Sequence, residues 1–145
     1  MKALKFVLVL LSVYETFAVE EDCPEVIDRI CAATDVPSLN IKPYLWFANK
    51  CFFEKAQKLG TNNFASLEIV PKAKCENYDS CVSFENTCKN IEHKTTNLQC
   101  VSSNGIDFYD FQNTCEVLGW QCYDEILVFV GMGTCNSTQP FEVVN

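Results

Sequence analysis

The sequence predicts a small disulfide-rich α+β fold made of two similar halves. Three observations lead to this prediction: ten cysteines in a chain of 145 residues, their division into two spans of similar length, and one order of elements in both spans. The spans run from Cys23 to Cys75 and from Cys81 to Cys135. Hydrophobic residues are 48% of the chain, enough for a core. Each span is nevertheless so short that we expect it to depend on disulfides.

The N-terminus has the pattern of a secretory signal peptide. Lys2 and Lys5 form a positive start, an apolar run covers residues 6–13, and residues 16–18 form a small-x-small cleavage site. The apolar run is too short to span a membrane, which takes about 20 residues. We therefore expect residues 1–18 to be a signal peptide and the protein to be secreted and extracellular.

In an oxidising compartment, an even number of cysteines predicts disulfides, here five, with no leftover thiol. Zinc is the competing use of cysteine clusters, but the chain has no C-x-x-C pair and a single histidine, His93. His93 lies in a polar segment, which is more typical of a surface residue than of a catalytic base. The sequence therefore predicts no metal, no cofactor and no enzyme activity.

The charge balance narrows the possible partners. The chain has 11 Lys+Arg against 19 Asp+Glu and a net charge of -8. Nucleic-acid binding needs a basic surface, and an acidic protein is repelled by anionic membranes. We therefore expect neither a nucleic acid nor a membrane as partner.

The first span predicts a helix over residues 49–60, because an asparagine cap opens it, good helix formers follow and a glycine closes it. A short strand over residues 67–70 then leads to the last cysteine of the span. Apolar residues repeat along one face of the helix, which we expect to pack on the core. They are Phe52, Ala56 and Leu59.

The second span repeats this order. Residues 113–119 predict a shorter helix, again with an asparagine start and a glycine stop, and residues 125–130 predict a strand that ends at Gly131. The common order of loop, helix, strand and cysteine indicates a diverged tandem repeat.

Two further features lie outside this pattern. Asn136-Ser137-Thr138 is an N-glycosylation sequon just beyond the last cysteine, where we expect it to be exposed. Aromatic residues gather beside the first helix; most are expected in the core, and the excess in the loop 32–50 is a candidate partner-binding surface. These aromatics are Tyr44, Trp46, Phe47, Phe52 and Phe53.

The cysteine-flanking motifs resemble the Kazal domain of serine-protease inhibitors. Phe47-Ala48-Asn49-Lys50-Cys51 matches the Tyr-x-Asn-x-Cys motif of that family, and Phe111-Gln112-Asn113-Thr114-Cys115 repeats it. The segment Cys23-Pro-Glu-Val-Ile-Asp-Arg-Ile-Cys31 has the family's usual length between its second and third cysteines, and Cys100-Val-Ser-Ser-Asn-Gly105 resembles its Cys-Gly-x-Asp-Gly turn. The resemblance covers Cys23 to Cys135.

This resemblance implies two tandem Kazal-like domains, each a short helix packed on a small antiparallel sheet. The first would cover residues 19–76 with four cysteines and the second residues 77–138 with six, leaving 139–145 as a tail. The family's bridges, carried over to this chain, imply five pairs. They are Cys23–Cys51, Cys31–Cys75, Cys81–Cys122, Cys88–Cys115 and Cys100–Cys135.

The resemblance also implies how the protein acts. In the family, the residue two places after the second cysteine enters the specificity pocket of the protease, and a spacer asparagine braces the loop through its side-chain amide. The implied function is a monomeric secreted inhibitor whose partner is an extracellular serine protease. The inhibitory-loop residues are Pro24, Glu25, Val26 and Ile27 in the first domain and Asn90 and Ile91 in the second, with Asn49 and Asn113 as spacers.

The pocket residue restricts the target. Glu25 would be repelled by the acidic pocket of trypsin-like enzymes and poorly solvated in an apolar one, so a Glu-preferring or broad-specificity protease is the expected partner. The second loop is longer than the first, and the first domain lacks one bridge of the family pattern. The alternative is a non-inhibitory secreted interaction module that keeps the disulfide scaffold.

Overall fold

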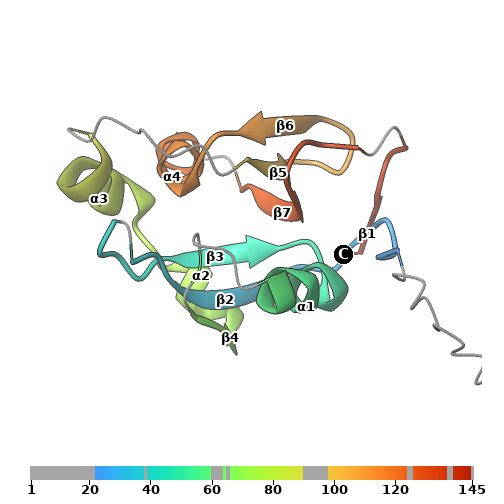
Figure 1. Ribbon diagram of the computed structural model, residues 1–145, viewed down its shortest axis with the longest axis horizontal. Coiled ribbons are helices and arrows are strands. Elements are labelled where there is room, and N and C mark those ends of the chain that lie inside the picture. The colour runs from blue at the N-terminus through green and yellow to red at the C-terminus, as the bar shows by residue number, and fades with distance from the viewer. Residues whose placement is uncertain are drawn as a thin grey trace, which may run out of the picture.

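A six-stranded mixed sheet forms the centre of the computed structural model, which describes residues 22–37, 39–59, 64, 66–89, 98–123, 126–136 and 139–144 (Figure 1). Together with four α-helices and five disulfides, it confirms the predicted small disulfide-rich α+β class. The strands are β1 (Val26–Ile27), β2 (Ile30–Asp35), β3 (Tyr44–Phe47), β4 (Ser66–Val70), β5 (Gln99–Ser102), β6 (Phe108–Phe111), β7 (Val128–Met132) and β8 (Glu142–Val143). The helices are α1 (Lys50–Leu59), α2 (Lys72–Glu76), α3 (Ser80–Ser83) and α4 (Thr114–Gln121), and a π-helical turn follows α3 over Phe84–Cys88.

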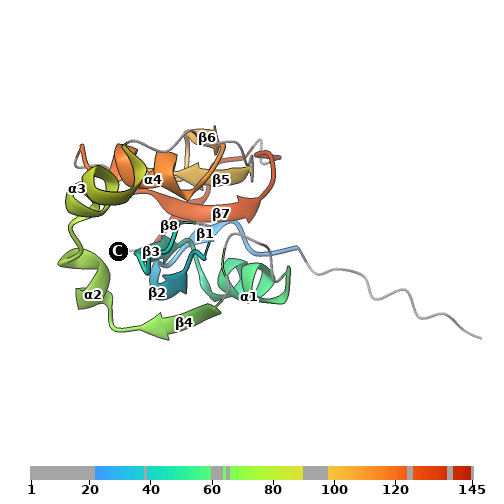
Figure 2. The same ribbon diagram turned by 60° about the vertical axis from the view of Figure 1, so that its left-hand side comes forward.

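The sheet consists of two three-stranded units with the same topology, in the order β4-β2-β3-β7-β5-β6 (Figure 2). In the first unit β2 pairs antiparallel with both β3 and β4, and in the second β5 pairs antiparallel with both β6 and β7. The parallel pair β3–β7 joins the units, with Trp46 opposite Val128 and Phe47 opposite Phe129. One continuous sheet therefore runs through both halves of the chain.

Each unit carries one longer helix after its second strand. Helix α1 begins after Asn49 and ends at Leu59, close to the predicted bounds. Its buried face was predicted only in part, because Phe53 and Ala56 are each 4% exposed whereas Leu59 is 59% exposed. The prediction for Leu59 is wrong: the helix turns Phe53 toward Phe47 of β3, with ring centroids 5.6 Å apart, and leaves its last turn outside the core.

The second unit departs further from its predicted bounds. Helix α4 extends to Gln121, so Gly119 lies inside the helix instead of ending it. A Cβ atom at Gly119 would lie 3.1 Å from the Phe84 ring, so this glycine allows the π-helical turn to approach. Strand β7 starts later than predicted and continues through Gly131 to Met132, and a bulge between Phe129 and Gly131 shifts the register of its pairing with β5.

Buried side chains lie on both faces of the sheet. Helices α1 and α4 cover one face, where Leu45, Phe47, Val101 and Phe129 are at most 1% exposed. The opposite face carries the second cluster, which includes residues of β1 and α2 and Phe141 from the C-terminal end. Contacts of Phe141 therefore connect the end of the chain to the centre of the sheet.

The structure pairs all ten cysteines within their own halves. The pairs are Cys23–Cys51, Cys31–Cys75, Cys81–Cys122, Cys88–Cys115 and Cys100–Cys135, the pairs that the family resemblance implies. Five disulfides in a chain of this length suggest an oxidising, extracellular type of environment. Within the described residues, none of the helices has the length and apolar character needed to cross a membrane.

Candidate functional site

The Cys23–Cys31 loop is tethered at both ends. Cys23 is bonded to Cys51 in the first turn of α1, and Cys31, which lies in β2, is bonded to Cys75 in α2. Between these anchors Ile27 is only 5% exposed, whereas Pro24 and Glu25 are exposed. The sequence therefore places an exposed acidic residue on a segment whose flanking positions are fixed to the scaffold.

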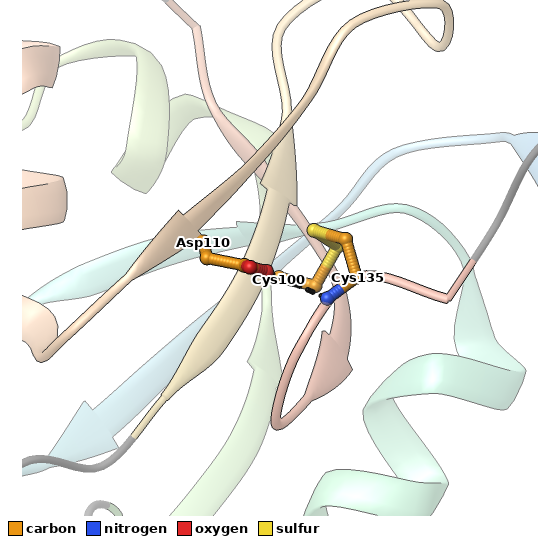
Figure 3. A group of neighbouring side chains, drawn as sticks. All are labelled: Cys100, Asp110 and Cys135. Carbon is orange, nitrogen blue, oxygen red and sulfur yellow. Dashed lines mark hydrogen bonds between the residues drawn. A yellow bond between two sulfur atoms is a disulfide. The ribbon is translucent and has the colours of Figure 1, made fainter.

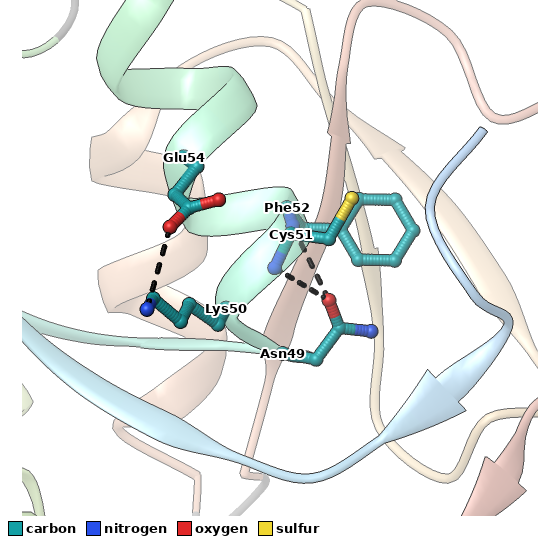
Figure 4. A network of polar contacts seen from close by, with 5 residues as sticks. All are labelled: Asn49, Lys50, Cys51, Phe52 and Glu54. Carbon is teal, nitrogen blue, oxygen red and sulfur yellow. Dashed lines mark hydrogen bonds and ion pairs between the residues drawn. The ribbon is translucent and has the colours of Figure 1, made fainter. Parts of the chain in front are cut away.

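The Asn49 side chain links this loop to helix α1. Its Oδ1 atom accepts hydrogen bonds from the backbone N–H groups of Cys51 at 3.0 Å and Phe52 at 3.3 Å, which caps the helix (Figure 4). Its Nδ2 atom donates to the carbonyl oxygens of Pro24 at 3.0 Å and Val26 at 2.8 Å. One amide group, 8% exposed, thus caps the helix and holds the loop on both sides of Glu25.

The first turn of α1 separates its polar contacts by side. Asn49 faces the loop, while Lys50 and Glu54 form an exposed ion pair of 3.6 Å on the outer surface (Figure 4). Exposed pairs of this kind stabilise a helix by only about 0.3–0.5 kcal/mol. Within this turn it is therefore Asn49, and not the ion pair, that connects the helix to the loop.

A C-terminal strap, residues 141–144, runs along the other side of the loop. Its strand β8 pairs in parallel with β1, with Val26 opposite Glu142 and Ile27 opposite Val143. The N–H of Glu142 donates to the carbonyl of Glu25 at 2.9 Å, and the N–H of Val144 donates to the carbonyl of Ile27 at 2.9 Å. Residues 139–145 were predicted only as a tail, so this contact was not predicted. A pattern of Phe-Glu-Val-Val after Pro140 was the available signal for a strand.

Phe141 anchors the strap. It is 7% exposed, and its ring lies 5.9 Å from that of Phe52 and 5.2 Å from that of Phe108. Its N–H donates to the carbonyl of Gly105 at 2.6 Å. Gly105 has a φ of +77°, and a Cβ atom there would lie 3.1 Å from both the Phe141 oxygen and the Ile27 side chain.

The second half repeats the capping part of this arrangement. Asn113 accepts a hydrogen bond from the N–H of Glu116 at 3.1 Å, and the Glu116 carboxylate accepts one from the N–H of Gln112 at 2.6 Å. The loop residues Asn90 and Ile91 lie outside the described residues, as does His93. The geometry of an inhibitory loop is therefore available for the first half alone.

One group of potential metal ligands occurs among the described residues, formed by Cys100, Asp110 and Cys135. The two cysteine sulfurs are joined in a disulfide, so neither is available as a thiolate (Figure 3). The Asp110 carboxylate accepts a hydrogen bond from the N–H of Cys135 at 2.6 Å. The group therefore has a structural explanation: it connects β6 to the segment after β7.

The aromatic surface proposed from the sequence is mostly core. Trp46, Phe47 and Phe53 are buried, and the rings of Tyr44 and Phe52 are partly buried against neighbours. Tyr44 packs edge-on against Tyr78. Burial raises the pKa of Tyr78 above its ordinary value because it disfavours the phenolate, although the hydrogen bond with Ser83 acts in the opposite direction.

The sequon asparagine, Asn136, is exposed as predicted.

Comparison with known proteins gives no assignment. No family model, no curated protein and no solved structure matches the chain.

Proposed function

We propose that the protein is a secreted Kazal-like serine-protease inhibitor that acts through the Cys23–Cys31 loop. The observation that supports this best is the pair of hydrogen bonds that the Asn49 side-chain amide donates to the carbonyls of Pro24 and Val26. These bonds fix the backbone on both sides of Glu25, whose side chain is at the exposed part of the loop. A loop whose backbone is already held in one conformation loses less conformational entropy on binding, which favours tight association.

The tethers also favour inhibition over digestion. If a protease cut the bond between Glu25 and Val26, disulfides at Cys23 and Cys31 and the Asn49 amide would still hold both new ends. Ends kept in place favour rejoining, because the reaction is then intramolecular. The product would therefore stay bound instead of leaving the enzyme.

Glu25 sets the target. A carboxylate at the pocket position requires a cationic or strongly polar pocket, so we propose a Glu-specific extracellular serine protease as partner. Glu25→Lys reverses the charge and matches the acidic pocket of trypsin-like enzymes. Asp28→Lys, three residues further along the loop, is the control with the same change of charge.

The test is inhibition of a panel of trypsin-, chymotrypsin-, elastase-, subtilisin-like and Glu-specific enzymes. We expect stoichiometric inhibition of the Glu-specific enzyme, transferred to the trypsin-like enzyme by Glu25→Lys but not by Asp28→Lys. The proposal is wrong if no enzyme is inhibited by the full chain, by Glu25→Lys, or by either protein shortened to end at Phe141.

The second candidate function is a non-inhibitory secreted interaction module on the same scaffold. It is favoured by one observation, the hydrogen bond from the Glu142 N–H to the Glu25 carbonyl, which engages the loop backbone within the molecule. In either case we propose that residues 1–18 direct secretion and that Asn136 carries an N-linked glycan. Mass spectrometry of the secreted protein, before and after removal of N-glycans, tests both points.

A further inference from the structure

The Cys23–Cys31 loop makes a tight turn at Glu25, where the N–H of Val26 donates to the carbonyl of Pro24 at 2.8 Å, and its carbonyl groups accept hydrogen bonds from two different elements. Those of Pro24 and Val26 accept hydrogen bonds from the Asn49 amide on the scaffold side. Those of Glu25 and Ile27 accept them from the strap, through the N–H groups of Glu142 and Val144. The strap thus occupies the backbone groups on the side of the loop away from Asn49.

A serine protease needs one of these groups. The carbonyl that precedes the scissile bond must enter the oxyanion hole, where backbone N–H donors of the enzyme bind its oxygen. For the Glu25–Val26 bond, this is the Glu25 carbonyl, which lies 2.9 Å from the Glu142 nitrogen. The enzyme and the strap therefore compete for the same oxygen.

The strap is an ordered competitor. Phe141 fixes its start between Phe52 and Phe108, and the two hydrogen bonds of β8 follow directly. Figure 1 shows this C-terminal segment, in red, descending from the second half to lie beside β1, in blue. Residues beyond Phe141 contribute the competing donors, whereas Phe141 contributes the burial.

We infer that the strap masks the inhibitory loop and that release or trimming of residues 142–145 unmasks it for a serine protease. This inference rests on the proposed function, because it names the regulation of the same loop. It separates two parts of the strap: the anchor at Phe141, which belongs to the core, and the donors at Glu142 and Val144, which cover the loop.

The experiment compares four proteins: the full chain, a chain ending at Phe141, Glu142→Pro and Glu142→Ala. The shortened chain lacks both donors but keeps the buried anchor, and Glu142→Pro removes one N–H in the full-length protein. Glu142→Ala is the matched control, since it removes the same carboxylate but keeps the N–H. Inhibition constants against the Glu-specific enzyme and the rate of cleavage at Glu25–Val26 are both measured.

We expect the shortened chain and Glu142→Pro to inhibit at least about tenfold more tightly than the full chain, and Glu142→Ala to behave like the full chain. Equal inhibition by all four proteins would show that the strap does not mask the loop, and it would leave the proposed function intact. If none of them inhibits the Glu-specific enzyme, the proposed target is wrong, and the rates of cleavage at Glu25–Val26 then test the mask. Faster cleavage of the shortened chain then supports the mask, and equal cleavage rates overturn it.

Discussion

At the scale of single residues, Asn49 has two structural functions that are usually separate. Its oxygen satisfies the first backbone donors of α1, and its nitrogen satisfies two carbonyls of the Cys23–Cys31 loop. A helix cap needs only the acceptor, which serine or aspartate also provides. The loop needs two donors, and of these three residues only asparagine has two N–H donors beside its acceptor oxygen, because serine has a single O–H and aspartate has none.

Two substitutions at this position separate the functions. Asn49→Ser keeps an acceptor for the cap and loses two hydrogen bonds to the loop, which costs about 2 kcal/mol of unfolding free energy. Asn49→Asp also keeps the cap but places a charged oxygen near the carbonyls of Pro24 and Val26, so it should cost more.

Denaturant unfolding of the oxidised proteins measures both effects, and inhibition should weaken in the same order. Equal stability of Asn49→Ser and the unchanged protein would show that the bonds to the loop contribute nothing. A larger loss for the serine variant than for the aspartate variant would contradict the proposed role of charge.

At the scale of elements, the turn between β5 and β6 supports the strap. Gly105 combines a left-handed backbone with close approach of Phe141 and Ile27. Gly133 also has a left-handed backbone, with a φ of +94°, but nothing lies within 4 Å of a Cβ atom placed there. A substitution at Gly133 therefore tests backbone strain alone, whereas the same substitution at Gly105 tests backbone strain together with packing.

Alanine at either glycine should cost about 1–2 kcal/mol, because an L-residue is disfavoured at these angles. Gly105→Ala should cost at least about 1 kcal/mol more, since Phe141 or Ile27 must move. Thermal unfolding compares the stabilities, and amide exchange at Glu142 reports on the strap. We expect faster exchange in Gly105→Ala and unchanged exchange in Gly133→Ala; equal effects of the two variants would contradict the packing role.

Elements with local signals were predicted, and those that depend on distant contacts were not. The start of α1 follows from Asn49, whose cap involves neighbours in the sequence. The buried face of that helix depends on Phe47 of β3, and for this reason Leu59 was assigned wrongly. The loop residues Pro24 to Ile27 were named only because the motifs around the cysteines resemble those of the Kazal family. The strap that covers them was missed, because nothing local connects residues so far apart in the chain.

At the scale of the whole molecule, the two edge strands of the sheet, β4 and β6, could pair between two molecules as β7 and β3 pair within one. When the two three-stranded units are superimposed by their strand pairing, β3 corresponds to β6 and β7 corresponds to β4. Asp110 of β6 then takes the position of Trp46, and Glu68 of β4 takes the position of Val128. A second copy added through β4 and β6 in the same way would place Asp110 opposite Glu68 where the internal pair has Trp46 opposite Val128. Like charges at these positions disfavour such head-to-tail growth.

Removing these charges should therefore promote association. The double variant Glu68→Gln with Asp110→Asn keeps the acceptor oxygen used by Cys135, and it should self-associate severalfold more strongly, because a facing like-charge pair costs up to about 1 kcal/mol. Analytical ultracentrifugation at several concentrations measures this. Glu76→Gln with Asp28→Asn is the control, because it removes two exposed acids away from β4 and β6. If the unchanged protein already assembles as strongly as the double variant, the acids are not the barrier.

The separation of the disulfides by halves has a consequence for how the chain reaches its native state. Ten cysteines considered together allow a very large number of pairings, whereas four allow about three and six allow about 15. Since every native bridge stays within its own half, the first set can be completed while the second is still being synthesised. The search for correct bridges is thereby divided into two smaller searches, and the strand pairs that join the halves, β3–β7 and β1–β8, form no covalent bond.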